Sequence, residues 1–219
     1  MGNRKKIKKY YFSVEGETEK WYFDWLQELI NDTEKAVYNV SFDVKKQKNP
    51  LKYAKSLVVT GKTEIYHISD YESDEEIHVK QFTETMDNMK KAMGIGKQIT
   101  YRFGYSNLTF DLWMILHKDD CNGSVYHRDN YIIPINKAYD EKFVDMKEYK
   151  HEDNFKRCLK KLNIQNVVDA VKRADRIMRQ NQDRGYTLHK YKGFEYYKEN
   201  PSLNIWKAVE KILMDCGLM

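Results

Sequence analysis

The stretch "YYFSVEGETEKWYF", residues 10–23, begins with the pattern of a buried strand and ends with that of an amphipathic helix. Between the two patterns lies Gly16, with Glu15 before it and Glu17 and Glu19 after it. Because glycine adopts left-handed backbone conformations freely, we expect Gly16 to allow a sharp turn that directs Glu15 into a cleft. Glu17 and Glu19 have a simpler interpretation, since acidic side chains are favourable in the first turn of a helix.

The composition of the chain indicates a globular protein with one sizeable core. Its 219 residues are 41% apolar and 32% charged, and the net charge is +5. No apolar run approaches the ~20 residues that a membrane-spanning helix needs, and no secretory signal is recognisable. The cysteines, Cys121, Cys158 and Cys216, are odd in number and form no CxxC pair. We therefore expect a cytoplasmic protein with free thiols and no membrane partner.

Strand and helix patterns alternate through the first half of the chain. The expected strands cover residues 7–14, 37–45, 64–69 and 98–105, and the expected helices cover residues 18–30, 50–58, 75–93 and 107–118. Repeated strand–helix units are typical of a mostly parallel sheet with helices on its faces. The sequence therefore predicts an α/β fold.

The second half of the chain has a different pattern. Residues 121–135 look irregular, and residues 136–219 look largely helical. No linker rich in Pro, Gly or Ser separates the two halves. We therefore divide the chain into an α/β domain, residues 1–120, and a mostly helical C-terminal portion, residues 121–219, that packs on it to form one structural unit.

Polar side chains follow three of the expected strands, at the edge of a parallel sheet where ligands bind. Glu15 follows the first strand, and Asp70 and Glu72 follow the third. Carboxylate oxygens without Cys or His suit Mg²⁺ or Mn²⁺, so these three are the candidate metal ligands and catalytic residues. Asn107 and Asp111 lie four residues apart on the expected helix 107–118, which follows the fourth strand, so they share a helix face. They are candidates to position the substrate.

Two basic clusters are candidate contacts for nucleic acid. They consist of Lys5 and Lys6 before the first strand and of Lys172, Arg173, Arg176 and Arg179 on a late helix. Lysine and arginine side chains bind phosphate backbones. The simpler alternative is a Lys-rich leader and a solvated helix face, because a modest positive charge is only an electrostatic indication.

Four motifs resemble those of the RloB/AbiLii family, which is associated with abortive infection in defence against phage. They are "VEGETEKWYF" (14–23), "HISDYE" (67–72), "SNLTFDLWMILH" (106–117) and "NPSLNIW" (200–206). The resemblance extends over residues 7–212. The third motif is the most specific, because helix periodicity alone gives no reason for such a string.

The resemblance implies a Toprim-like sheet, similar to that of topoisomerases, primases and OLD-type nucleases. The glutamate that follows the first strand of that fold falls on Glu15, and its D-x-D step falls on Asp70 and Glu72. The resemblance also implies a partner ATPase of the AAA/ABC-like type that holds the protein inactive until infection.

The chain departs from the family pattern at four positions. Glu72 replaces the second Asp of D-x-D, Leu108 replaces Pro, Asp111 replaces Glu, and Leu203 replaces Thr. Glu72 has a longer side chain than Asp, and Asp111 has a shorter one than Glu. A carboxylate is therefore kept at both acidic positions, but the shorter side chain of Asp111 changes how far its oxygens extend.

Two functions of different classes are compatible with the sequence. The first is a Mg²⁺-dependent nuclease of anti-phage defence that cleaves RNA or DNA phosphodiesters. The alternative is a non-catalytic nucleic-acid-binding or regulatory subunit of the partner ATPase, and a third possibility is an adaptor that only docks onto that ATPase. The sequence leaves the oligomeric state open.

Overall fold

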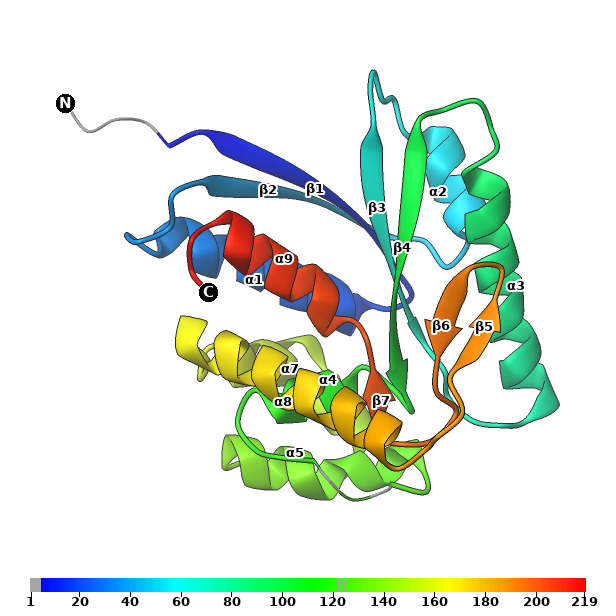
Figure 1. Ribbon diagram of the computed structural model, residues 1–219. Helices are drawn as coiled ribbons and strands as arrows, with labels where there is room; N and C mark the ends of the chain where they lie inside the picture. The colour runs from blue at the N-terminus through cyan, green and yellow to red at the C-terminus, as the bar shows by residue number, and fades with distance from the viewer. Residues whose placement is uncertain (1–4, 122, 124) are drawn as a thin grey trace.

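The computed structural model describes residues 5–121, 123 and 125–219. Its centre is a five-stranded sheet with strand order β2-β1-β3-β4-β7 (Figure 1), in which β1 to β4 are parallel and β7 is antiparallel. The strands are β1 Ile7–Val14, β2 Asn39–Lys46, β3 Thr63–Asp70, β4 Ile99–Asn107 and β7 Ser202–Leu203, with a separate hairpin of β5 His189–Tyr191 and β6 Phe194–Tyr196. The α/β fold with a mostly parallel sheet is confirmed.

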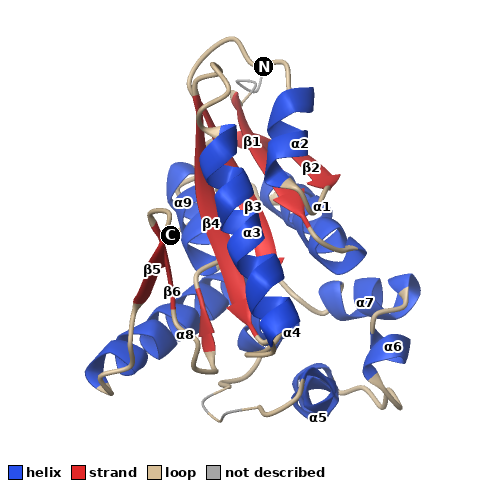
Figure 2. Cartoon of the chain, turned by 90° about the vertical axis from the view of Figure 1, so that its right-hand side faces the viewer, coloured by secondary structure: helices blue, strands red, loops and turns tan. Residues whose placement is uncertain are grey.

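Helices cover both faces of the sheet. Helices α2 and α3 lie on the face turned to the viewer in Figure 2, and α1 and α9 lie on the other face. The helices are α1 Glu17–Asp32, α2 Pro50–Ser56, α3 Glu76–Ala92, α4 Asp111–Leu116, α5 Ile132–Tyr139, α6 Met146–Tyr149, α7 Glu152–Leu159, α8 Ile164–Asp183 and α9 Trp206–Asp215, with a 3₁₀ turn, η1, at Arg128–Tyr131. Within the described part of the chain, no helix is long and apolar enough to cross a membrane.

Two apolar clusters form because successive side chains of a strand point to opposite faces. Phe12 and Ile68 pack with Phe23 of α1 on one face, whereas Ile65 packs with Phe82 of α3 on the other. The first cluster includes side chains from both halves of the chain, such as Val209 of α9. The C-terminal portion also supplies β7, so it completes the sheet as well as packing on it.

The turn from β1 into α1 differs from expectation. Gly16 is the N-cap of α1, and its backbone is extended, with φ −129° and ψ 179°; the predicted left-handed turn is therefore wrong. The position instead requires space, because a Cβ on Gly16 would lie 2.8 Å from Oε2 of Glu19. Glu19 is only 3% exposed, so its carboxylate cannot move aside into solvent.

The segment after β4 also differs from expectation. The predicted helix over 107–118 is shorter in the structure, because Asn107 is the last residue of β4 and α4 begins at Asp111. Asn107 and Asp111 therefore do not share a helix face. Two backbone hydrogen bonds hold the end of β4 against the segment that follows β3. The N–H of Tyr71 donates to the carbonyl of Ser106 (3.0 Å), and the N–H of Glu72 donates to the carbonyl of Leu108 (2.9 Å).

The predicted irregular segment 121–135 contains the 3₁₀ turn and the start of α5. Pro134 lies within the first turn of α5, where backbone N–H groups have no partner inside the helix, so proline is tolerated there. Within the region expected to be helical, β5 and β6 form a hairpin. Lys192 and Gly193 connect them with φ of 52° and 90°, as the tight turn of a two-residue hairpin requires.

Gly104, in the middle of β4, allows the sheet to pack closely. A Cβ there would lie 2.6 Å from Cδ1 of Ile68 and 3.4 Å from Cα of Ile205. We expect Gly104→Ala to lower the free energy of unfolding by roughly 1–3 kcal/mol through overpacking. Ile68→Val, which removes the clashing methyl, should restore part of that loss in the double variant. Denaturant unfolding of the four proteins measures this, and strictly additive effects would contradict the proposed contact.

Candidate active site

The carboxyl ends of β1 and β3 meet at one edge of the sheet. Glu15 directly follows β1, and Asp70 is the last residue of β3. Together with Glu72, they line one small pocket of about 20 Å³. This is about the volume of a single water molecule or ion. The structure thus brings the three predicted carboxylates together, with His78, Gln81 and Phe82 of α3, Ser69 and Tyr71 completing the wall.

Glu15 is half-buried at this edge. Its Oε1 accepts a hydrogen bond of 2.6 Å from the hydroxyl of Ser69. Burial raises the pKa of Glu15 from its ordinary value of 4.5 to about 7; the Ser69 bond and Lys48 oppose the shift, and the carboxylates of Glu19 and Glu72 add to it. A carboxyl group with a pKa near 7 can both accept and donate a proton at neutral pH.

Asp70 is surrounded by other acidic groups. Burial raises its pKa well above the ordinary range, and the nearby carboxylates of Glu19, Glu15 and Asp111 raise it further. Burial likewise raises the pKa of Glu19, whose Oε2 accepts a hydrogen bond of 2.8 Å from Thr18. Glu19 does lie in the first turn of α1, as predicted, but it is also buried. It belongs to a carboxylate cluster that consists of Glu15, Glu19, Asp70, Glu72 and Asp111.

Asp111 is the most deeply buried carboxylate of the cluster. One oxygen, Oδ2, accepts from the hydroxyl of Thr109 (2.7 Å) and forms an ion pair with Nζ of Lys150 (2.7 Å). The other oxygen, Oδ1, is buried and has no hydrogen-bond partner among the described residues. Although burial opposes it, the negative charge of Asp111 raises the pKa of Lys150, so this lysine is a firmly charged ammonium.

Glu72 has an unusual backbone conformation for a side chain of its size. Its φ is 59°, in the left-handed region, which costs a non-glycine residue roughly 1–2 kcal/mol. Its carboxylate lies 3.1 Å from Nε2 of His78 and 3.6 Å from Nη1 of Arg128. Strained residues concentrate at functional sites, where the surrounding structure holds them in place.

The donor chemistry of this edge fits a hard divalent cation. Its carboxylates exceed its positive charges, and Asp111 keeps one buried oxygen unpartnered. Among the residues that the structure describes, no group of three or more His, Cys, Asp or Glu side chains could hold a metal ion. Mg²⁺ in enzymes is typically bound by only one or two carboxylates, with water and substrate phosphate completing its shell. Asp70 and Glu72, which line the same pocket, are the residues that would supply such carboxylates.

Asn107 does not belong to the carboxylate cluster. Its side-chain amide donates to the carbonyl of Lys198 at 2.6 Å and to that of Glu199 at 3.4 Å. It thus anchors the segment before β7 to the end of β4. The structure therefore gives Asn107 a structural contact, whereas Asp111 of the same predicted pair does lie in the cluster.

The predicted nucleic-acid contacts are spread over distant places. Lys5 and Lys6 precede β1, whereas Glu15 follows it, and at ~3.3 Å per residue the two ends are roughly 25–30 Å apart. The ammonium of Lys5 donates to the carbonyls of Thr33 (3.2 Å) and Glu34 (3.1 Å). Lys5 therefore stabilises the end of α1, and Lys6 is exposed.

On α8, most of the predicted basic cluster is paired with acids. Asp120 forms ion pairs with Arg173 (3.3 Å) and Arg176 (2.6 Å), and Asp175 pairs with Arg179 (2.8 Å). Lys172 is exposed. These pairs reduce the positive field that a phosphate backbone would meet on α8.

Sequence reasoning missed three side chains of this edge: Glu19, His78 and Lys150. A signal for Glu19 was present, because it stands three residues after Gly16 and a buried carboxylate there needs the glycine's open space. His78 lies two residues inside α3, and its Nε2 is 3.1 Å from the carboxylate of Glu72, whose backbone is left-handed. Lys150 lies about 80 residues beyond Asp70, and nothing in the sequence pattern places it at this edge.

Comparison with known proteins identifies the family. The family model described as RloB-like protein matches residues 10–212. The chain belongs to the RloB-like family. No curated protein and no solved structure matches the chain. The matched range includes Glu15, Asp70, Asp111 and Lys150, so the whole carboxylate cluster lies within the family region.

The raised pKa of Glu15 predicts a pH-dependent stability when divalent metal is removed. Native Glu15 holds its proton up to about pH 7, whereas the unfolded chain releases it above about pH 4.5. Wild-type stability should therefore be full below the unfolded pKa and fall as the pH rises toward 7, by at most roughly 3 kcal/mol. Glu15→Gln has no such proton and should lose less stability.

Thermal unfolding in EDTA at pH 5 and pH 8 measures this difference. Glu17→Gln is the matched control, because Glu17 lies at the same turn but is half-exposed and pairs with Lys46. The control should follow wild type. An equal loss of stability between the two pH values in wild type and Glu15→Gln would contradict the buried state of Glu15.

Proposed function

We propose that this protein is a Mg²⁺- or Mn²⁺-dependent nuclease that hydrolyses phosphodiester bonds. The observation that supports this most is the pocket at the carboxyl edge of β1 and β3, which three carboxylates line together. Hard oxygen donors at this edge of a parallel sheet suit a divalent ion that binds a phosphate. The Toprim-like relationship suggested by the sequence motifs agrees with this assignment.

Each carboxylate has a distinct role in the proposed mechanism. Asp70 and Glu72 would hold the divalent ion, which would supply Lewis-acid stabilisation of charge on the phosphate. Glu15 would take a proton from the attacking water as its oxygen bonds to phosphorus, because a carboxyl group with a pKa raised to about 7 can accept a proton at neutral pH. The bond from phosphorus to the leaving oxygen would break, and that oxygen would take a proton from solvent. The hydroxyl of Ser69 donates to Oε1 of Glu15, so the proton from water would be accepted by Oε2.

The proposed substrate is nucleic acid, either RNA, including tRNA, or DNA. The isoelectric point of 8.8 favours association with a polyanion. At the pocket, Arg128 and His78 face Glu72, and Lys48 lies near Glu15. Arg128 and Lys48 are better placed than Lys5 or α8 to contact phosphates that flank a bond cleaved at this edge.

In its biological setting, we propose that this RloB-like protein is the effector of an abortive-infection system against phage. A partner ATPase of the AAA/ABC-like type would keep it inactive until infection. This part of the proposal rests on family membership and on the motifs at residues 14–23 and 106–117. The activity of the isolated chain is therefore expected to be low unless the partner or its signal is present.

Three variants test the nuclease assignment. Asp70→Asn should lose Mn²⁺ binding, as measured by calorimetry, because it removes a charged ligand. Glu15→Gln should keep metal and nucleic-acid binding but lose cleavage of pooled RNA or plasmid by roughly 10²–10⁴-fold, the usual contribution of a general base. Glu17→Gln, at the exposed side of the same turn, should cleave like wild type.

The same experiment separates the nuclease from a non-catalytic subunit. A binding or regulatory subunit would bind nucleic acid equally well, or slightly better, when Glu15→Gln removes a negative charge. Cleavage that survives in both Glu15→Gln and Asp70→Asn would place the chemistry elsewhere and contradict the proposal.

A further inference from the structure

A single lysine from the C-terminal portion enters the carboxylate cluster. The ammonium of Lys150 lies 2.7 Å from Oδ2 of Asp111, whose side chain is 1% exposed, whereas the Lys150 side chain is 36% exposed. The carboxylates of Asp70 and Glu19 lie close enough to act on the same ammonium. Lys150 therefore reaches the cluster from the solvent side and ends against its most buried member.

The position of Lys150 is fixed by the fold around it. It directly follows α6, and its backbone N–H donates to the carbonyl of Met146. Its neighbour Tyr149 is fully buried and packs on Phe155 of α7, with ring centroids 5.5 Å apart. The lysine thus projects from a short turn that is anchored on both sides.

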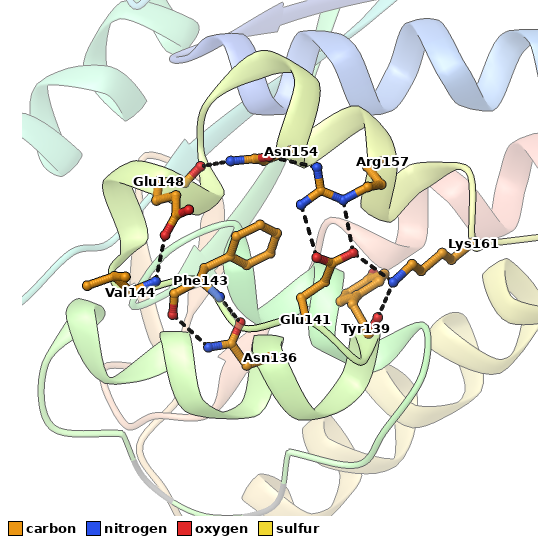
Figure 3. A network of polar contacts seen from close by, with 9 residues as sticks. All are labelled: Asn136, Tyr139, Glu141, Phe143, Val144, Glu148, Asn154, Arg157 and Lys161. Atoms are coloured by element: carbon orange, nitrogen blue, oxygen red, sulfur yellow. Dashed lines mark hydrogen bonds and ion pairs between the residues drawn. The ribbon is translucent and has the colours of Figure 1, made fainter.

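A polar network anchors the rest of this segment (Figure 3). Glu141 accepts from Arg157 (3.0 Å) and Lys161 (2.7 Å), which ties the end of α5 to α7. Asn154 of α7 donates to the carbonyl of Glu148 in α6 at 2.7 Å. These bonds join the end of α5, α6 and α7. The turn that carries Lys150, which lies between α6 and α7, is therefore fixed by its neighbours on both sides.

The cluster contains more acidic groups than Lys150 can pair with. Glu15, Glu19, Asp70 and Asp111 act on one another electrostatically, and Lys150 is the cation paired with the deepest of them. The other oxygen of Asp111, Oδ1, is buried without a hydrogen-bond partner among the described residues. A buried acceptor atom without a partner is costly, so the arrangement favours a further cation beside the ammonium.

We propose that Lys150 is a built-in counter-cation that occupies the place of a second metal ion, so that the site binds one divalent ion only. This inference rests on the proposed function and deepens it. Nucleases with two metal ions hold them about 3.5–4 Å apart between shared carboxylates. Here the ammonium occupies the Asp111 and Glu19 side of the cluster, and the divalent ion binds between Asp70 and Glu72.

Calorimetric titration with Mn²⁺ alone tests this inference without any nuclease assay. Wild type should bind one ion. Lys150→Met, which keeps the chain length and removes the charge, should bind a second ion or bind the first at least tenfold more tightly, because a neighbouring positive charge has been lost. Lys150→Arg, which keeps the charge, should behave like wild type. Lys147→Met is the matched control, because Lys147 is exposed on the same short helix.

The outcomes distinguish this inference from the proposed function. If wild type binds one ion and Lys150→Met binds no second ion and no more tightly, the inference is overturned and the metal site stands. If Lys150→Met binds Mn²⁺ and wild type does not, both the inferred single-ion site and the metal-dependent activity of wild type are overturned. If neither binds, both are overturned.

A second measurement in EDTA tests the ion pair itself. Lys150→Met should lower the midpoint of thermal unfolding, because it leaves Asp111 buried without its partner. Asp111→Asn should restore part of that loss in the double variant, since it removes the uncompensated charge. Strictly additive shifts would overturn the assignment of Lys150 as the counter-cation of Asp111.

Discussion

The mutual repulsion of carboxylates at the carboxyl edge of the sheet is the constraint around which this structure is arranged. Parallel strands deliver Glu15 and Asp70 to the same edge, and the start of α4 adds Asp111. Burial strengthens every interaction there because the surroundings have a low dielectric constant. Gly16 leaves space for the carboxylate of Glu19, the hydroxyl of Ser69 donates to Glu15, and the C-terminal portion supplies the ammonium of Lys150.

Burying carboxylates beside one another opposes folding, and perturbed acidic groups of this kind concentrate at functional sites. A purely structural network would pair each buried carboxylate, as Glu141 is paired with Arg157 and Lys161. The two arrangements have opposite effects on acidity. The paired Glu141 has its pKa lowered to about 2, whereas burial among acids raises that of Glu15 to about 7. Within one molecule, pairing with cations thus lowers the pKa of a carboxyl group, whereas burial beside other acids raises it.

The sequence predicted the sheet and much of the site because both depend on local patterns. The alternation of strand and helix patterns predicted the parallel strands. Glu15, Asp70 and Glu72 could be selected because they stand at or just after the ends of two of those strands. The sequence failed where tertiary contacts decide. Glu19 lies in the first turn of α1, where any helix tolerates an acid. Its carboxylate occupies the space that Gly16 leaves free, and a helix pattern gives no sign of this packing. Lys150 reaches the cluster through the packing of α5, α6 and α7, and no periodic pattern in the sequence indicates that packing. Strand β7 has only two residues, which is too short for a recognisable strand pattern.

Anomalous diffraction of a crystal of this protein soaked with saturating Mn²⁺ tests the proposed metal site most directly. We expect one strong peak at the pocket, within coordinating distance of Asp70 and Glu72, with the ammonium of Lys150 still paired to Asp111. A peak at any other position, or no peak at the pocket while Mn²⁺ is saturating, would contradict the central claim that the carboxylates at the ends of β1 and β3 form a divalent-metal site.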